Sequence, residues 1–467
     1  MYCAYVTKIQ NLRKHTNADR LLCGECFGNT VIVDLGTDPD QLGVYFPTDG
    51  KLGVEFATKN DLLRRKDENG NPAGGYLDPE KRNIKALKLR GEKSDGLFLP
   101  LTCLSSFTDI KALKEGDRIT VLNGVTICEK YVPASKPSSN SGGGGNRVRK
   151  RSDPISPLFK EHSDTEQLAY NLSAFHVADL VEITLKMHGT SQRTGYLPVL
   201  KGYSYRNGLE KKLYLNEKTP AWLRSKIKRT PVYDWGYVTG TRRVVLDTFD
   251  EGGFYGNNAF REKHAKQFEG KLLKGETVYY EVVGFTDQGV PIMASADNKR
   301  TGDKEFIKQY GKTTVFSYGC DPRPTPDMPQ SDFYVYRMTM TNEDGDVVEY
   351  PPDFMRYRCE QMGIKCVPML WRGTIPEFIQ LPDDVGSPMA TDAGAFIKSI
   401  AEIYYDGPDP VGKSHIREGV VCRIVNRPKF TAYKHKNFFF KALEGLVKES
   451  ATAPDMEESQ EVGEQDG

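Results

Sequence analysis

Short runs of alternating or continuous apolar residues dominate the first quarter of the chain. They cover residues 2–9, 21–27, 30–35, 44–46, 97–101 and 118–122. Asn, Asp, Gly and Pro separate these runs, as expected for strands joined by tight turns. The pattern predicts a small, closed or nearly closed β-barrel over residues 1–126.

The large middle of the chain, residues 161–448, mixes two periodicities. Residues 259–273 and 352–363 have helical spacing, whereas 277–284 is a strongly apolar strand. No period of 20 to 50 residues recurs, which argues against a repeat architecture. We therefore expect an α+β domain of antiparallel sheets with flanking helices.

Composition changes abruptly at two places. Residues 133–157 are rich in Pro, Ser, Asn and Gly and end in Arg and Lys, which predicts a flexible linker over 127–160. Residues 449–467 hold seven carboxylates and no Lys or Arg, so we expect a disordered acidic tail.

Bulk properties restrict the class of protein. The chain has 467 residues, 38% of them hydrophobic and 27% charged, and its formal net charge is +1. Any nucleic-acid footprint must therefore be local. No apolar run reaches membrane-span length and the start lacks a secretory signal, so we expect a soluble protein in the cytoplasm without membrane contact. Nine spread cysteines indicate reduced thiols, and Cys23 and Cys26 are expected to be buried.

Lys186 ends the alternating stretch 181–186 and is followed by Met187, His188 and Gly189. An amine presented where a strand meets a glycine turn is placed to attack a nucleotide phosphate. Lys-x-x-Gly also occurs at Lys88, Lys93, Lys299 and Lys308. The spacing alone does not select Lys186, and we expect the Lys93 match to be a barrel turn.

Candidate partners for such an amine follow in order along the chain. They are Arg242 or its neighbour Arg243, Glu281, Tyr336, Glu418, and the pair Lys434 and Lys436. Lys434 and Lys436 lie two apart, so on a strand they face one side. Each also has a structural alternative: Glu281 as an ion pair, Tyr336 as core, Glu418 and Gly419 as a turn, and the two lysines as an edge-strand solubility device.

Taken together and in order, these segments resemble the five nucleotidyltransferase motifs of the RNA ligase 2 family. The segments are 186–191, 280–284, 333–336, 418–421 and 434–436. Ser191 differs from the Asn of phage-type members, and Arg423 from the Lys of many members. An N-terminal β-rich module is similar to that of the Deinococcus-type RNA ligases, and residues 17–23 resemble the opening of an OB-type nucleic-acid-binding module.

The resemblance implies an ATP-dependent RNA ligase that needs Mg²⁺ or Mn²⁺. Lys186 would form the lysyl-adenylate. His188, Gly189, Ser191, Arg242, Glu281, Tyr336, Glu418, Lys434 and Lys436 would bind the nucleotide, with Glu281 and Glu418 also near the metal. The substrate would be RNA with 3′-OH and 5′-phosphate ends, held at a nick in a duplex. The alternatives are a DNA ligase, an mRNA-capping guanylyltransferase, and a nucleic-acid-binding protein without catalysis.

Overall fold

The computed structural model describes residues 2–132, 153–163, 165–216, 218–246, 249, 258–380 and 389–449. Most of the predicted linker and nearly all of the predicted acidic tail lie outside these residues. No helix among them is long and apolar enough to cross a membrane. The predicted boundaries of the domains remain predictions.

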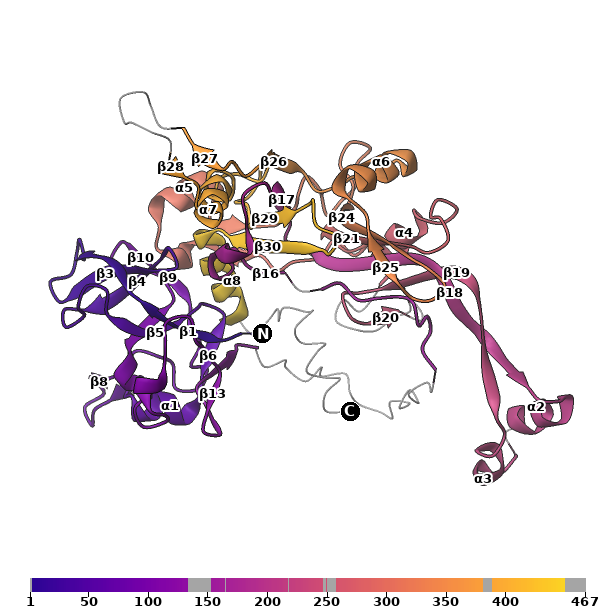
Figure 1. Cartoon of the computed structure of the whole chain (residues 1–467), viewed down its shortest axis with the longest axis horizontal. Coiled ribbons are helices and arrows are strands. Elements are labelled where there is room, and N and C mark those ends of the chain that lie inside the picture. The colour runs from indigo at the N-terminus through magenta and orange to yellow at the C-terminus, as the bar shows by residue number, and fades with distance from the viewer. Residues whose placement is uncertain are drawn as a thin grey trace.

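Residues 2–132 form several small antiparallel sheets around two clusters of buried apolar residues (Figure 1). The largest has the strand order β11-β5-β1-β12, and a second has the order β2-β3-β4. The elements are β1 (Ala4–Lys8), β2 (Gln10–Lys14), β3 (Leu21–Cys26), β4 (Asn29–Asp34), β5 (Leu42–Phe46), β6 (Gly50–Leu52), α1 (Val54–Lys59), β7 (Arg65–Lys66), β8 (Pro72–Gly74), β9 (Ala86–Leu89), β10 (Glu92–Asp95), β11 (Leu97–Pro100), β12 (Arg118–Ile119), β13 (Val121–Leu122), β14 (Val125–Thr126) and β15 (Cys128–Lys130).

Each predicted strand of this region corresponds to an observed strand within a few residues. Cys23 and Cys26 are buried in β3, as expected. The expected barrel turn at Lys93 is wrong, because residues 92–95 form β10 and pair with β9. Only Gly96, whose φ of +132° favours glycine, lies in the bend that follows.

The remaining residues form the larger part of the molecule. Its elements are β16 (Glu166–Gln167), β17 (Leu180–Lys186), β18 (Thr190–Tyr205), α2 (Gly208–Leu215), α3 (Ala221–Arg224), β19 (Arg229–Gly240), β20 (Val245–Leu246), α4 (Ala259–Lys266), β21 (Glu276–Gly284), β22 (Ala296–Asp297), α5 (Lys304–Tyr310), β23 (Thr313–Thr314), β24 (Ser331–Thr341), β25 (Val347–Glu349), α6 (Pro352–Met362), β26 (Met369–Thr374), β27 (Phe378–Ile379), β28 (Met389–Ala390), α7 (Ala393–Tyr404), β29 (Gly419–Ile424), β30 (Thr431–Lys436) and α8 (Phe438–Glu449).

Two sheets organise this part. One has the order β16-β30-β29-β17-β26, and the other has the order β20-β19-β18-β21-β24-β25. Consecutive strands β17 and β18 belong to different sheets, so the three residues between them carry the chain from one sheet to the other. α7 packs against the first sheet and α4 and α6 against the second (Figure 1). The α+β expectation for this region is confirmed.

The helix expected over 259–273 is shorter than predicted. α4 ends at Lys266 and continues as single turns, in which the amides of residues 267–269 bond to the carbonyls three residues before them. Gly270 then takes a φ of +75°, which ends helical geometry. The second predicted helix matches α6, which Gly363 ends in the same left-handed conformation.

The N-terminal region contacts the larger part through α8 and α5, and through Tyr170, whose ring stacks on that of Tyr5 at a centroid separation of 4.5 Å. Lys441 of α8 is paired with Asp95, and Lys88 is paired with Asp303. Ala86 is buried against Phe438 and Ala442. Of the six basic residues between 81 and 93, Lys88 and Lys93 therefore face this contact, since the Lys93 ammonium lies 5.2 Å from the centre of the Phe438 ring.

Candidate active site

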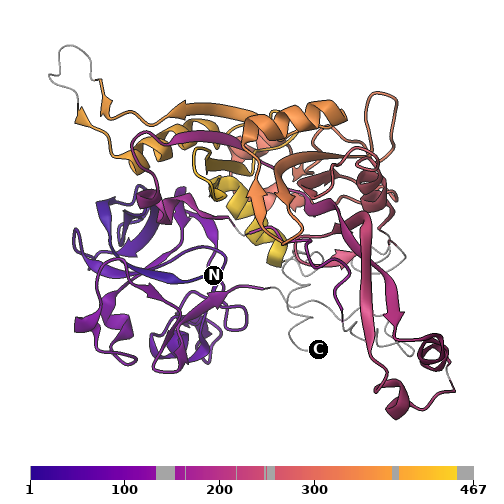
Figure 2. The ribbon, with the colours of Figure 1, turned by 45° about the vertical axis from the view of Figure 1, so that its right-hand side comes forward.

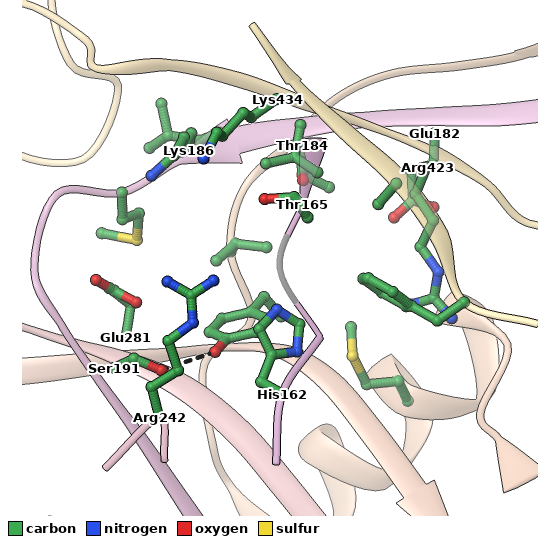
Figure 3. A pocket seen from close by; sticks show the side chains of 18 of the residues that line it. His162, Thr165, Glu182, Thr184, Lys186, Ser191, Arg242, Glu281, Arg423 and Lys434 are labelled. Carbon is green, nitrogen blue, oxygen red and sulfur yellow. Dashed lines mark hydrogen bonds between the residues drawn. The ribbon is translucent and has the colours of Figure 1, made fainter. Parts of the chain in front are cut away.

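Side chains of strand β17 point alternately to its two faces, and this alternation places Lys186 at a pocket. Val181 and Ile183 point into the core beneath the sheet, and both are fully buried. Glu182, Thr184 and Lys186 point to the other face and line a pocket (Figure 3). The alternation of side chains that predicts the strand therefore also places Glu182, Thr184 and Lys186 on the face that lines the pocket.

Gly189 is needed for the turn between the two sheets. A Cβ on Gly189 would overlap the carbonyl oxygen of Val282 and lie 2.9 Å from Cγ of Glu281. Its backbone N–H donates to Glu281 Oε1 at 3.1 Å, and the N–H of His188 donates to the Tyr318 hydroxyl at 2.7 Å. Glycine in Lys-x-x-Gly therefore lets the turn lie directly on β21.

Glu418 is the buried centre of a charge cluster beside Lys186. Its Oε1 lies 2.8 Å from Lys186 Nζ and 3.4 Å from Lys436 Nζ, and Lys436 Nζ also lies 2.8 Å from Glu444. Burial favours the neutral acid, but Lys186, Lys436 and His188 outweigh it and hold the pKa of Glu418 below its usual range. Glu418 is therefore a carboxylate in contact with the candidate nucleophile.

His188 is buried behind this cluster. Its ring meets Phe316 and Phe440 edge to face, at centroid separations of 4.7 and 4.8 Å. Burial lowers the pKa of His188 to about 4, so the imidazole is neutral at pH 7 despite Glu418 Oε2 at 3.8 Å. We assign His188 to packing that supports the Lys186 turn rather than to ion pairing.

Lys434 reaches the same pocket from β30 (Figure 3). Register explains its position: Thr184 pairs with Val421, and Val421 pairs with Lys434 across β17, β29 and β30. Burial, and then the nearby charges of Lys436, Lys186 and Arg242, lower the pKa of Lys434 to about 7. The pocket holds more positive charge than its carboxylates offset, as a site for a polyanion would.

The second sheet supplies the opposite wall. Glu281 pairs with Ser191 on β18, and the Ser191 hydroxyl lies 3.0 Å from the Tyr336 hydroxyl (Figure 3). Between β21 and β24 the register shifts, so that Tyr280 faces Val335, Tyr279 faces Arg337, and Tyr336 is the extra residue. Such a bulge redirects a side chain, and here Tyr336 lines the pocket.

The arginine that enters the pocket is Arg242. Its side chain lines the wall near Glu281 (Figure 3), whereas Arg243 is exposed and is not among the lining residues. Buried Arg193 fixes the segment by donating to the Arg242 carbonyl at 2.9 Å. Of the two sequence candidates, the structure places Arg242 at the pocket.

Arg423, which stands where many members of the resembling family carry Lys, lines the pocket from β29. It donates to the Tyr350 carbonyl at 3.1 Å and lies 4.9 Å from the Phe430 ring centre. Figure 3 shows it at the far end of the pocket from Lys186. Arg423 thus closes that end together with Glu182, which accepts two hydrogen bonds from Arg356.

Comparison with solved structures shows what this arrangement of sheets is similar to. No family model matches the sequence. Three structures of an RNA ligase from Naegleria gruberi match nearly the whole chain. A lysine-to-alanine variant with ATP and Mn has a TM-score of 0.51 and 16% sequence identity, and the match covers 96% of this chain and 99% of that chain. A second lysine-to-alanine variant with ATP and Mn (16% identity) and a glutamate-to-alanine variant with AMP and Mn (15% identity) both have a TM-score of 0.50, and each match covers 95% of this chain and 99% of that chain. The chain has an RNA ligase-like fold.

Several residues that line the pocket of this ligase-like fold were not predicted from the sequence. Thr184 and Glu182 follow from the β17 alternation that was already recognised. His162 and Thr165 come from the first residues of the larger part and give no local signal. His162 meets the Tyr336 ring edge to face at 5.1 Å, and burial, followed by Arg337 and Arg242, lowers its pKa well below the usual value.

The carboxylates of the ligase-like fold fit a divalent cation held jointly with a nucleotide. No group of three or more His, Cys, Asp or Glu that could hold a metal alone occurs among the described residues. Glu418 Oε2 is buried and accepts no hydrogen bond from the described residues. Mg²⁺ commonly takes one or two carboxylates and completes its coordination with phosphate oxygens and water. Glu418 and Glu281 match that need.

Proposed function

We propose that the chain is an ATP-dependent RNA ligase that joins 3′-OH and 5′-phosphate ends at nicks in duplexes. The observation that carries this proposal is one pocket that combines the strand-end amine of Lys186 with Lys434, Arg242 and Glu281. Buried Glu418 lies 2.8 Å from that amine without lining the pocket. An RNA ligase-like fold over nearly the whole chain supports it. We further propose that the chain is an RNA ligase 2-type enzyme with an OB-like N-terminal module.

In the first step the Lys186 Nζ lone pair attacks the α-phosphorus of ATP. An N–P bond forms, the bond from the α-phosphorus to the bridging oxygen breaks, and pyrophosphate leaves, while the amine gives up a proton. Lys434 and Arg242 would neutralise charge on the phosphates, and the Tyr336 ring would hold the adenine. Mg²⁺ or Mn²⁺ held by Glu281 and Glu418 would supply electrostatic stabilisation of the triphosphate.

Two transfers complete the reaction. AMP passes from Lys186 to the 5′-phosphate of the RNA, which forms a phosphoanhydride and frees the amine. The 3′-OH then attacks that 5′-phosphate, a phosphodiester forms, and AMP is expelled. The protein contributes alignment of the two ends and charge neutralisation at the phosphates.

Replacing Lys186 tests the proposal directly. Wild-type protein incubated with α-labelled ATP and Mg²⁺ or Mn²⁺ should acquire a covalent label, and Lys186→Ala should acquire none, because the attacking amine is gone. The exposed lysine variant Lys308→Ala is the control and should label normally. A label that persists in Lys186→Ala would contradict the proposed chemistry.

Assays with different nucleic-acid ends and nucleotides distinguish the related functions. Sealing of nicks with RNA ends, dependent on ATP, supports an RNA ligase. Preference for DNA ends would identify a DNA ligase, labelling by GTP instead of ATP a guanylyltransferase, and nick binding without any label a non-catalytic binding protein.

A further inference from the structure

Strands β18 and β19 continue far beyond the sheet that holds the pocket. They pair from Arg193 with Gly240 to Tyr205 with Arg229 and end in the short helices α2 and α3. Figures 1 and 2 show this hairpin leaving the body of the molecule. We call residues 201–235 the arm.

The arm contributes almost nothing to the core. Thr219 is the only buried residue among those the structure describes in the arm. At its root, Tyr233 donates to the Pro154 carbonyl at 3.1 Å and the Lys274 ammonium lies 5.2 Å from the Trp235 ring centre. Farther out lie local contacts: the Arg229 guanidinium lies 3.7 Å from the Tyr203 ring centre, and Tyr205 and Tyr214 are 5.5 Å apart. An extension whose outer part packs on itself calls for a role outside the molecule.

Positive charge is concentrated in the arm. Residues 201–235 hold nine Lys and Arg, two Glu and one Asp, a formal charge of +6, whereas residues 1–200 and 236–448 together carry only +2. Seven of the nine basic side chains are exposed: Lys201, Arg206, Lys211, Lys212, Lys218, Lys226 and Lys228. Clustered basic residues of this kind neutralise phosphates.

The arm is also anchored at the pocket. β18 begins at Thr190 beside Ser191, and β19 ends at Gly240, two residues before Arg242. Tyr205 lies fourteen residues beyond Ser191 along one strand, which is about 45 Å at the usual rise per residue. That length corresponds to roughly a dozen base pairs of duplex at 3.4 Å each.

We propose that the arm binds the phosphate backbone of the duplex that carries the nick, about a dozen base pairs from the ends being joined. This inference rests on the proposed function for its substrate. Exposed Trp222, Leu209 and Leu215 at the tip would also suit an anionic membrane surface. A duplex fits better, because Lys201 and Arg229 carry positive charge on the stem as well as at the tip, and the stem starts at the pocket.

Removing charge from the arm tests the inference. The arm variant carries Lys211→Gln, Lys212→Gln, Lys226→Gln and Lys228→Gln. The control variant carries Lys304→Gln, Lys308→Gln, Lys312→Gln and Lys413→Gln, four exposed lysines outside the arm. Binding of nicked RNA duplexes with flanks of 6 or 20 base pairs is measured by fluorescence anisotropy between 50 and 200 mM salt, with DNA duplexes of the same lengths in parallel.

We expect wild-type protein to prefer the long flanks and the arm variant to show no such preference, with affinity for the long duplex lower by about tenfold or more. The slope of log Kd against log salt should fall by up to about 0.9 for each phosphate that the arm no longer neutralises, and the control should keep the wild-type slope. Equal affinities of the arm variant and the wild type, or equal weakening in both variants, would overturn the inference. So would loss of binding to anionic phospholipid vesicles with duplex affinity unchanged.

Covalent labelling with ATP separates this inference from the proposed function. The arm variant should label like the wild type, because none of its substitutions lies in the pocket. If no protein labels but duplex binding still depends on the arm, the proposed function fails and the arm inference stands.

Discussion

The proposed binding of ATP should depend on pH through Lys434. With a pKa of about 7, its amine is mostly neutral at pH 8 and mostly charged at pH 6. A bound triphosphate favours the ammonium, so binding raises the Lys434 pKa and, at pH 8 but not at pH 6, takes up roughly one proton. Calorimetry of ATP binding in buffers of different ionisation enthalpy measures this uptake.

The conservative variant Lys434→Arg gives the matched control. A guanidinium stays charged at both values of pH, so its binding should show no proton uptake. If Lys434→Arg and the wild type take up the same number of protons at pH 8, another group is responsible.

Gly189 should tolerate no side chain. Gly189→Ala places a methyl group against the Val282 carbonyl, which forces the Lys186 turn away from β21. We expect a loss of about 1–3 kcal/mol in the free energy of unfolding and slow adenylate formation. Gly208→Ala, whose Cβ meets nothing within 4 Å, should change stability by less than about 0.5 kcal/mol. Chemical denaturation of both variants checks this, and equal stabilities would contradict the steric argument.

At the scale of elements, α8 connects the N-terminal region to the pocket. One face of the helix meets Asp95 through Lys441, while Glu444 holds Lys436 and Phe440 packs on His188. The helix directly follows the strand that carries Lys434. Movement of α8 therefore alters the surroundings of the pocket.

Breaking the pair between Lys441 and Asp95 should weaken both stability and catalysis. Lys441→Met keeps the apolar stem but leaves Asp95 without its cation, which costs about 2 kcal/mol. Urea unfolding and the rate of covalent labelling report the two effects. Lys8→Met, which removes an exposed pair with Glu115, is the control and should change little. A wild-type labelling rate in Lys441→Met would show that α8 does not couple Asp95 to the pocket.

Elements were predictable where their signal was local. The strand before Lys186 and helix α6 could be predicted because alternation, or helical spacing with a terminal glycine, lies within a few residues. The pairing of β17 between β29 and β26 could not, since its partners lie about 190 or more residues away. For the same reason, neither the position of His162 at the pocket nor the bulge that turns Tyr336 into the pocket could be predicted.

At the scale of the whole molecule, the sequence predicts the order of the parts along the chain but not which of their surfaces contact one another. Lys88 and Lys93 belong to the basic run between residues 81 and 93, yet they contact α5 and α8. A basic cluster has the same composition whether it faces solvent, RNA or another part of the chain, so only the tertiary arrangement distinguishes these roles.

Deleting residues 1–132 tests the proposed role of the N-terminal module. We expect the covalent label to survive, because every pocket residue lies beyond residue 160, and sealing of nicked RNA to fall by roughly tenfold or more because the module no longer holds the phosphate backbone. The deletion also uncovers Phe438 and Tyr170, so a version with Phe438→Ser and Tyr170→Ser keeps the new surface polar. Absence of labelling in both versions would assign the module to adenylate formation as well.

Residues 193–205 and 229–240 pair across the hairpin with one irregularity, between Leu200 and Gly202. Because side chains alternate with a period of two, removing two residues from each strand shortens the hairpin without reversing any face. Ser191 and Arg242 would keep their places at its root. The reach of the arm is therefore an adjustable length, which natural variation or design can change in steps of about 7 Å while the chemistry at the other end stays the same.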